Sequence, residues 1–212
     1  MTYIKEYKGD GSTSEGWPSE SDWYDFEDLW VVNKHQMGTT CNNVFGVENN
    51  SDEENEAIYN SIKEVSQSTG VDNRFILAIM MQESNGCVRV HTTSYSHDNP
   101  GLFQSNQGTG SCNPKNGSPM SPCPNDEIKQ MVEDGVAGTA SGDGLKQLLA
   151  TCQGKGAQSY YEAARMYNSG SVASDGNLGQ GVATHCYASD VANRLSGWAT
   201  GDKQCSEATV GS

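Results

Sequence analysis

The sequence predicts a mainly α-helical fold with one long loop or short β-ribbon segment inserted between its helices. Apolar residues recur at the spacing of one helix face in about seven stretches, whereas the alternation typical of strands is nearly absent. A stretch rich in Gly, Ser, Asn and Pro, residues 85–125, separates the early helices from the later ones. Because so long a segment is unusual in a compact domain, we expect it to build a binding surface or a short ribbon.

The chain opens with an extended segment. Residues 1–20 contain two turn-forming runs, at 9–12 and 16–19, both rich in Gly and Ser. Apolar residues at helical spacing begin near residue 21 and predict a first helix over residues 25–34. We therefore expect an N-terminal lead-in, residues 1–20, followed by one domain over residues 21–212.

The next two helices carry clear end signals. Ser51 is an N-cap in front of acidic residues, which the helix dipole favours in a first turn, and Gly70 is a stop signal. The acidic residues therefore indicate a helix start rather than a metal site. Asp72 caps a second helix that runs to about Ser84 and is nearly all apolar at its centre, so it should lie in the middle of the core.

Four further helices are predicted by apolar residues at i, i+3, i+4 and i+7. They are expected near residues 128–132, 145–152, 160–167 and 188–198, with Gly135, Gly154 and Gly170 as punctuation between them. No internal repeat is evident.

The composition restricts the class of partner. A chain of 212 residues can bury a sizeable core. Its 13 basic and 27 acidic residues give a net charge of −14, which argues against a nucleic-acid partner because nothing would replace the counterions of the phosphates. No apolar run approaches the roughly 18 residues that span a bilayer, and the N-terminus lacks an apolar signal core. We expect a mature, monomeric protein without a membrane partner.

Seven cysteines are scattered along the chain without C-x-x-C pairs, a pattern of disulfide staples rather than of a zinc or redox site. We infer a secreted, extracellular protein with up to three disulfides and one remaining thiol. Cys112 and Cys123 are near enough in sequence to close a local loop, and the other pairings stay open. The four histidines show no ligand spacing, so no metal or cofactor is expected.

Glu83, at the end of the apolar helix, is the main candidate for chemistry. An ionised Glu beside so much apolar surface loses hydration, so its pKa should rise above the ordinary value of about 4.3. A protonated Glu donates a proton to a glycosidic oxygen in glycosidases. From its position alone, a solvated helix-terminal Glu is the alternative.

Three motifs in order supply the context of this residue. Glu83-Ser84 ends the core helix, residues 99–104 read Asn-Pro-Gly-Leu-Phe-Gln, and residues 167–170 read Tyr-Asn-Ser-Gly. This series, over roughly residues 51–200, resembles the goose-type lysozyme and soluble lytic transglycosylase superfamily, and its flanking runs look like secreted fungal muramidase-like members. The resemblance implies a lysozyme-like helical domain, with a glycan cleft between the helix ending at Glu83 and residues 86–125.

The resemblance also implies roles for single residues. Glu83 matches the catalytic acid, and Tyr167 matches the tyrosine that hydrogen-bonds to it and orients it. Gln104 matches a residue that lines the saccharide cleft, and Gly101 would let the backbone approach the sugar without a Cβ. The candidate substrate-binding residues are Tyr95, Gly101, Leu102, Gln104 and Asn168.

A second carboxylate decides the type of reaction. Inverting hydrolysis needs a general base about 6.5–9.5 Å from the acid, whereas retention needs a nucleophile at about 5–5.5 Å. Lytic transglycosylases, as a family, lack this base and form an anhydro product. Asp98 is the candidate base, since goose-type enzymes place acidic residues there, and residues 92–97 depart from the transglycosylase Ser-x-x-Gly-Ala run. Its alternative role is to cap its own loop as an Asx turn.

The sequence therefore predicts a muramidase that hydrolyses the β-1,4 link between N-acetylmuramic acid and N-acetylglucosamine. This specificity comes from the resemblance alone, and the expected partner is peptidoglycan or a related aminosugar polymer. The alternatives are a lytic transglycosylase, a chitinase and a non-catalytic glycan-binding protein. A cysteine peptidase built on Cys87 or Cys112 with a histidine is a weaker alternative, because no active-site pattern surrounds either cysteine.

Overall fold

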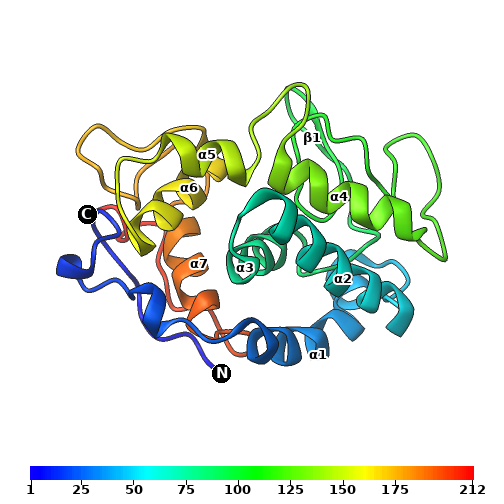
Figure 1. Cartoon of the computed structure of the whole chain (residues 1–212), viewed down its shortest axis with the longest axis horizontal. Helices are drawn as coiled ribbons and strands as arrows, with labels where there is room; N and C mark the ends of the chain where they lie inside the picture. The colour runs from blue at the N-terminus through cyan, green and yellow to red at the C-terminus, as the bar shows by residue number, and fades with distance from the viewer. The chain divides into compact units, whose positions relative to one another are not determined.

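The computed structural model describes residues 1–212 and is mainly α-helical, which confirms the predicted fold class at this level (Figure 1). The α-helices are α1 (Phe26–Phe45), α2 (Asp52–Thr69), α3 (Asn73–Ser84), α4 (Asn125–Ala137), α5 (Leu145–Thr151), α6 (Ala157–Ser169) and α7 (Tyr187–Leu195). Two short 3₁₀ helices, η1 (Thr13–Glu15) and η2 (Glu20–Asp22), precede them, and a two-stranded ribbon, β1 (Thr93–Ser94) and β2 (Asp98–Asn99), follows α3. None of the helices has the length and apolar character required to cross a membrane.

The chain folds as two compact units. The terminal unit consists of Met1–Leu29 and Leu148–Ser212, and the central unit consists of Trp30–Gln147. In the central unit α2 packs against α3 and α4, and in the terminal unit α6 packs against α7. Each unit therefore has its own set of buried helix faces.

Helices α2 and α3 begin and end where the sequence predicts. The Ser51 side chain accepts a hydrogen bond from the Glu54 N–H at 3.1 Å, and the Glu54 carboxylate accepts one from the Ser51 N–H at 2.8 Å, which forms a capping box. Gly70 ends α2 in the left-handed conformation, with a φ of 75°. Asp72 caps α3, whose residues 75–81 are all buried, so the predicted central position of this helix is confirmed.

Helix α1 is longer than predicted, since it continues from residue 34 to Phe45. The buried face continues through Asn33, Met37 and Cys41 at four-residue spacing. The sequence does not reveal this face because it begins with a polar residue, Asn33, and its two apolar residues, Met37 and Cys41, stand isolated among polar neighbours. Val31, although apolar, lies off this face and is 68% exposed.

Gly135 does not separate two helices, as the sequence predicted, but lies inside α4. The ring of Phe103 packs directly on it, and a Cβ at this position would lie 2.3 Å from Phe103 Cγ. The glycine is thus required by close packing rather than by a turn. Gly154 and Gly170 do follow helices as predicted, and Gly170 ends α6 in the left-handed conformation.

Three disulfides are formed, Cys41–Cys87, Cys112–Cys123 and Cys186–Cys205. The predicted number and the predicted local loop are confirmed, and Cys152 is the remaining thiol. Disulfides in this number are typical of proteins from oxidising compartments.

The first residues of the chain pack into the terminal unit. Tyr3, Tyr7 and Trp17 are buried, although residues 1–20 contain little regular structure. The Tyr3 hydroxyl donates to Asp190 Oδ1 on α7 at 2.7 Å, and the Tyr7 N–H donates to Ser189 Oγ at 2.9 Å. The segment is therefore extended in backbone but part of the core of this unit.

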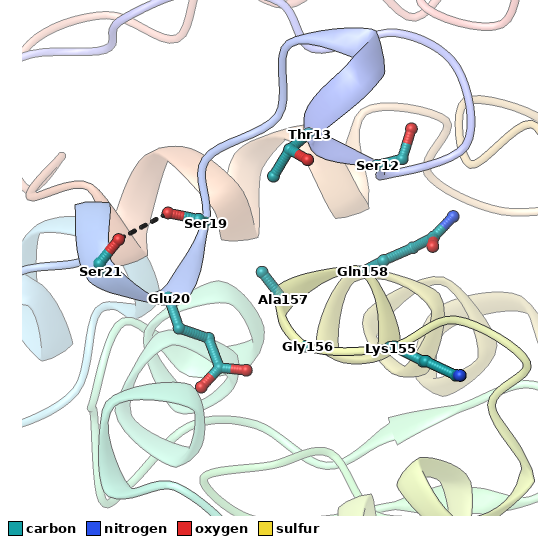
Figure 2. Close-up of a pocket in the computed structure, with 9 residues that line it drawn as sticks. All are labelled: Ser12, Thr13, Ser19, Glu20, Ser21, Lys155, Gly156, Ala157 and Gln158. Atoms are coloured by element: carbon teal, nitrogen blue, oxygen red, sulfur yellow. Dashed lines mark hydrogen bonds between the residues drawn. The ribbon is translucent and has the colours of Figure 1, made fainter.

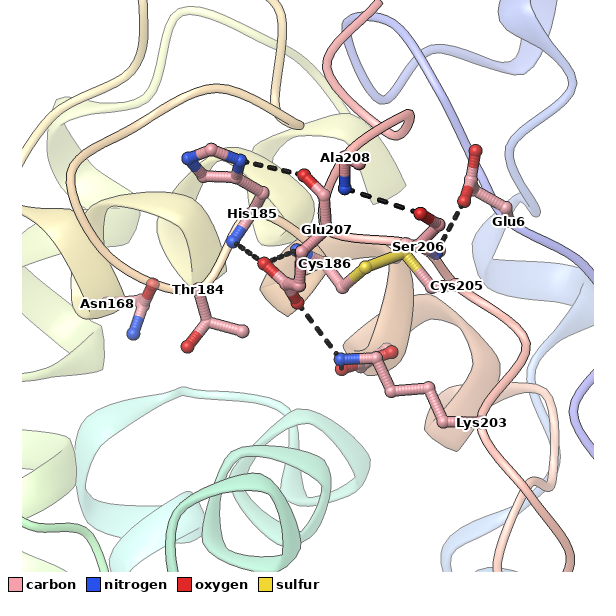
Figure 3. A network of polar contacts seen from close by, with 12 residues as sticks. Glu6, Asn168, Thr184, His185, Cys186, Lys203, Cys205, Ser206, Glu207 and Ala208 are labelled. Atoms are coloured by element: carbon pink, nitrogen blue, oxygen red, sulfur yellow. Dashed lines mark hydrogen bonds and ion pairs between the residues drawn. A yellow bond between two sulfur atoms is a disulfide. The ribbon is translucent and has the colours of Figure 1, made fainter.

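The C-terminal segment is fastened to the start of α7 (Figure 3). The Glu207 carboxylate accepts hydrogen bonds from the backbone N–H groups of His185 at 2.6 Å and Cys186 at 3.3 Å. It also forms an ion pair with Lys203 at 3.1 Å, and the Cys186–Cys205 disulfide joins the same two segments. Covalent and polar links together hold the end of the chain in place.

Candidate active site

Glu83 lies in the last turn of α3 and is half-buried. The seven residues at positions 75–81 in front of it are buried, so the carboxylate follows directly on the most apolar part of the unit. Asn85 ends the helix in the left-handed conformation, with a φ of 51°. The rise in the Glu83 pKa that these surroundings predict stays a prediction.

The residues that directly follow Glu83 are held in place by hydrogen bonds and a disulfide. Asn50 Nδ2 donates to the carbonyl of Gly86 at 2.7 Å, and Asn50 Oδ1 accepts from the Val88 N–H at 3.0 Å. The disulfide from Cys87 to Cys41 lies between these two contacts and buries both cysteines. The segment that follows α3 is therefore tied to α1 by the disulfide at Cys41 and to the chain just before α2 by Asn50.

A buried ion pair provides the next anchor. Arg89 and Glu54, whose side chains are 1% and 5% exposed, form a two-pronged contact with N–O distances of 2.6 and 2.8 Å. Burial alone would raise the pKa of Glu54, but hydrogen bonds from Arg89, Ser51 and Cys123 outweigh it, so the pKa lies below its usual range. This acidic residue at the helix start is thus part of a structural ion pair.

The ribbon follows directly and carries two of the predicted site residues. Strands β1 and β2 pair antiparallel, with Thr93 opposite Asn99 and Ser94 opposite Asp98. Tyr95 lies in the turn between the strands and is 90% exposed. An aromatic ring so exposed on a paired hairpin is available to stack on a flat ligand.

Gln104 connects the predicted Gly-Leu-Phe-Gln turn to the ribbon. Its Oε1 accepts from the Thr93 hydroxyl at 2.8 Å, and its Nε2 donates to the carbonyls of Gly101 at 3.0 Å and His91 at 3.2 Å. Both amide hydrogens are used, and one lone pair of Oε1 is left for a ligand. Gln104 also has a φ of 47°, a strained conformation of a kind that clusters at functional sites.

The turn itself is packed against α4. Gly101 has a φ of 80°, and a Cβ there would lie 2.8 Å from Met131 Cγ and 3.0 Å from the Gly110 carbonyl oxygen. Leu102 is fully buried. The packing against α4 therefore explains the glycine, and Leu102 contributes to the core of the central unit.

Asp134 on α4 holds the segment that follows this turn. Asp134 Oδ2 accepts from the backbone N–H groups of Thr109 at 2.7 Å and Gly110 at 2.9 Å. Together with the contact between Phe103 and Gly135, these bonds place the loop that carries Gln104 on a regular element. Sites supported by helices are held more rigidly than sites on free loops.

Asp98 is a half-exposed carboxylate on β2. Its Oδ1 accepts from the Ser94 hydroxyl at 2.6 Å and forms an ion pair with Lys115 Nζ at 2.9 Å. Hydrogen bonds from Ser94 and then Lys115 hold its pKa below the usual range for an aspartate. The lowered pKa keeps the carboxylate ionised, which a general base requires, and leaves little of the protonated form that a general acid requires.

Tyr167 and Asn168 lie at the C-terminal end of α6, in the terminal unit. Asn168 Oδ1 accepts a hydrogen bond from Arg165, whose guanidinium is fully buried and also donates to the carbonyl of Thr184 at 2.8 Å. Burial lowers the pKa of Arg165. Asn168 thus holds the helix end by binding a buried cation (Figure 3 shows Asn168 and Thr184).

The cysteines offer no nucleophile. Cys87 and Cys112, the two candidates for a peptidase, are both in disulfides. The remaining thiol, Cys152, is half-buried, and burial together with the nearby Glu162 raises its pKa to about 12. Because the thiolate is the reactive form, the cysteine-peptidase alternative loses its chemical basis.

The terminal unit contains a polar hollow of about 400 Å³ that the sequence did not indicate (Figure 2). Its walls come from η1, η2 and the start of α6, and the lining residues are Ser12, Thr13, Ser19, Glu20, Ser21, Lys155, Gly156, Ala157 and Gln158. No aromatic ring lines it, so it offers hydrogen bonds but no surface on which a sugar could stack. For this reason it is not included in the candidate active site.

The predicted site residues are thus distributed over both units. The central unit contains Glu83, Tyr95, Asp98, Gly101, Leu102 and Gln104, and the terminal unit contains Tyr167 and Asn168. Comparison with models of known protein families and with curated proteins finds no match to this chain. The assignment of a function therefore depends on the residues and their surroundings.

Proposed function

We propose that the protein is a secreted muramidase of the lysozyme-like helical superfamily, which hydrolyses the β-1,4 link between N-acetylmuramic acid and N-acetylglucosamine in peptidoglycan. One observation carries this proposal. Glu83 ends a buried apolar helix, and an anchored chain leads from it to the ribbon and turn that carry Asp98 and Gln104.

In this mechanism Glu83 is the general acid. Its proton passes to the bridging oxygen as the bond from that oxygen to the anomeric carbon breaks, and the bond's electron pair stays on the leaving sugar. Water attacks the anomeric carbon and gives up a proton to Asp98, which the lowered pKa keeps ionised. Proton exchange with solvent then restores both carboxyl groups.

The sugar would be held by the ribbon and the turn. Gln104 presents its remaining Oε1 lone pair, and Tyr95 presents an exposed ring for stacking. The role of Tyr167 in orienting Glu83 rests on the sequence resemblance. With a net charge of −14, the protein gains no general attraction to an anionic wall, so its affinity must come from such local contacts.

Secretion is supported by the three disulfides, which persist in oxidising compartments. A bacterial wall is also an extracellular substrate for any other cell, which agrees with this location.

The general acid is tested by the Glu83→Gln variant. We expect clearing of a bacterial wall suspension to fall at least about 100-fold, because the amide cannot supply the proton. Binding to sedimented walls should persist. The matched control is Glu133→Gln on α4, another half-buried glutamate, which should clear the wall at the wild-type rate. If Glu83→Gln clears walls as fast as the wild type, the proposed function is wrong.

Product analysis separates hydrolysis from transglycosylation. Mass spectrometry of the released fragments should show reducing ends, whereas a lytic transglycosylase leaves anhydro ends that are lighter by one water. Anhydro ends would exclude Asp98 as an essential base. Release of fragments from chitin oligomers at a higher rate than from peptidoglycan would instead assign the chitinase alternative.

A further inference from the structure

The loop closed by the Cys112–Cys123 disulfide reaches the ribbon through Lys115. Lys115 Nζ lies 2.9 Å from Asp98 Oδ1, and Ser94 Oγ donates to the same oxygen at 2.6 Å. The two donors thus converge on one oxygen of the carboxylate, and Oδ2 has no protein partner. Such one-sided binding fixes the orientation of the carboxylate and leaves one oxygen for another group.

The base of this loop is attached to the segment that leads from Glu83 to the ribbon. Asn113, two residues before Lys115, donates through Nδ2 to the carbonyl of Arg89 at 3.0 Å. Its own carbonyl accepts from the Thr92 hydroxyl at 3.0 Å. Across the loop, the Met120 N–H donates to the carbonyl of Cys112 at 2.8 Å. Lys115 therefore extends from an anchored loop rather than from a free one.

We propose that Lys115 is a positioning residue for Asp98, which holds the carboxylate by Oδ1 so that Oδ2 takes the proton of the attacking water. This inference rests on the proposed function. The water oxygen forms the new bond to the anomeric carbon, its proton moves to Oδ2, and the leaving oxygen receives the proton of Glu83. Ser94 shares the task through its hydroxyl.

The electrostatics agree with this geometry. The hydrogen bonds from Ser94 and Lys115 both lower the pKa of Asp98, and the positive charge of Lys115 lowers it further. Two other titratable side chains lie on the ribbon: His97, whose Nδ1 lies 3.1 Å from Gln107 Nε2, and Tyr95, which is exposed in the turn and carries no charge at neutral pH. Lys115 is therefore the charge whose removal should change the titration of Asp98.

The test compares Lys115→Met with Lys115→Arg. With a soluble peptidoglycan fragment as substrate, we expect Lys115→Met to lose roughly two- to five-fold in kcat/KM near pH 4, the range that an exposed ion pair supports, and little at pH 7. The acidic limb of its pH profile should move to higher pH, whereas Lys115→Arg should keep the wild-type profile. Lys129→Met removes another exposed lysine with a 2.9 Å ion pair, to Glu64, and should leave the profile unchanged.

A titration without substrate separates the charge effect from any loss of fold. The carboxyl carbon of Asp98, assigned by its absence in Asp98→Asn, should titrate at higher pH in Lys115→Met than in the wild type. An unchanged titration together with an unchanged pH profile would overturn the proposal. If Asp98→Asn keeps wild-type activity, the role of Lys115 is also overturned, but the role of Glu83 stands. If the wild-type protein itself does not cleave peptidoglycan, the proposed function is overturned.

Discussion

Arg89 and Glu54 form the most buried ion pair of the central unit, with side chains 1% and 5% exposed. Their charges are matched by further hydrogen bonds, since Arg89 also donates to the carbonyls of Glu48 at 2.9 Å and Asn49 at 2.7 Å. Arg89 lies between Glu83 and the ribbon in the chain. The pair therefore combines a stabilising role with the anchoring of the candidate site.

Removal of one partner should be costly. We expect Arg89→Met to lower the free energy of unfolding by about 3–5 kcal/mol, because the Glu54 carboxylate would remain buried without its counter-ion. Urea unfolding followed by far-UV circular dichroism measures this loss. Lys129→Met, which breaks an exposed pair, should cost less than about 1 kcal/mol. Equal losses in the two variants would show that burial does not determine the strength of these pairs.

At the scale of elements, α4 supports the turn that carries Gln104. Gly135 on this helix accepts the ring of Phe103, and Asp134 holds the backbone of Thr109 and Gly110. The helix tolerates a glycine in its interior because the close contact compensates for the poor helix propensity. Gly38 in α1 is also a glycine inside a helix, but it makes no such close contact: nothing lies within 4 Å of the position that its Cβ would occupy.

A pair of substitutions tests this contrast. Gly135→Ala should lower the free energy of unfolding by roughly 1–3 kcal/mol, because the new methyl group would overlap the Phe103 ring. Gly38→Ala should raise the free energy by up to about 1 kcal/mol through helix propensity alone. Thermal unfolding of both variants gives the comparison, and a stabilised Gly135→Ala would contradict the close packing.

At the scale of the whole molecule, stability should depend on a few ionised carboxyl groups. The pKa values of Glu54 and Glu207 are lowered: burial alone would raise them, but hydrogen bonds and the cations Arg89 and Lys203 outweigh burial. A lowered pKa in the folded state contributes stability above the unfolded value of about 4.3, and this contribution is lost as pH falls through the folded value.

We therefore expect the free energy of unfolding to change little through these groups between pH 7 and about pH 5 and to fall at more acidic pH. Urea unfolding at a series of pH values measures this dependence. Glu54→Gln should be less stable at neutral pH and should show a shallower fall below about pH 4. An acid sensitivity equal to that of the wild type would mean that Glu54 does not contribute to it.

The limits of α2 and α3, the central position of α3 and the Cys112–Cys123 loop follow from the sequence alone. Each depends on residues close together in the chain: Ser51 with Glu54, Asp72 with Arg74, and two cysteines separated by 11 residues. Capping and helical periodicity act within a few residues, so their signals are complete in a short window of sequence.

Only the tertiary structure decided the full length of α1, the place of Gly135 inside α4 and the partners of the charged residues. Glu54 meets Arg89 across 35 residues, and Asp98 meets Lys115 across 17. No local sequence pattern marks either pair. Any acidic residue could pair with a given lysine or arginine, and only folding brings one particular partner within 3 Å. The sequence identified Glu83, Asp98 and Gln104 as candidates, whereas the surroundings that orient Asp98 and Gln104 depend on contacts between distant segments.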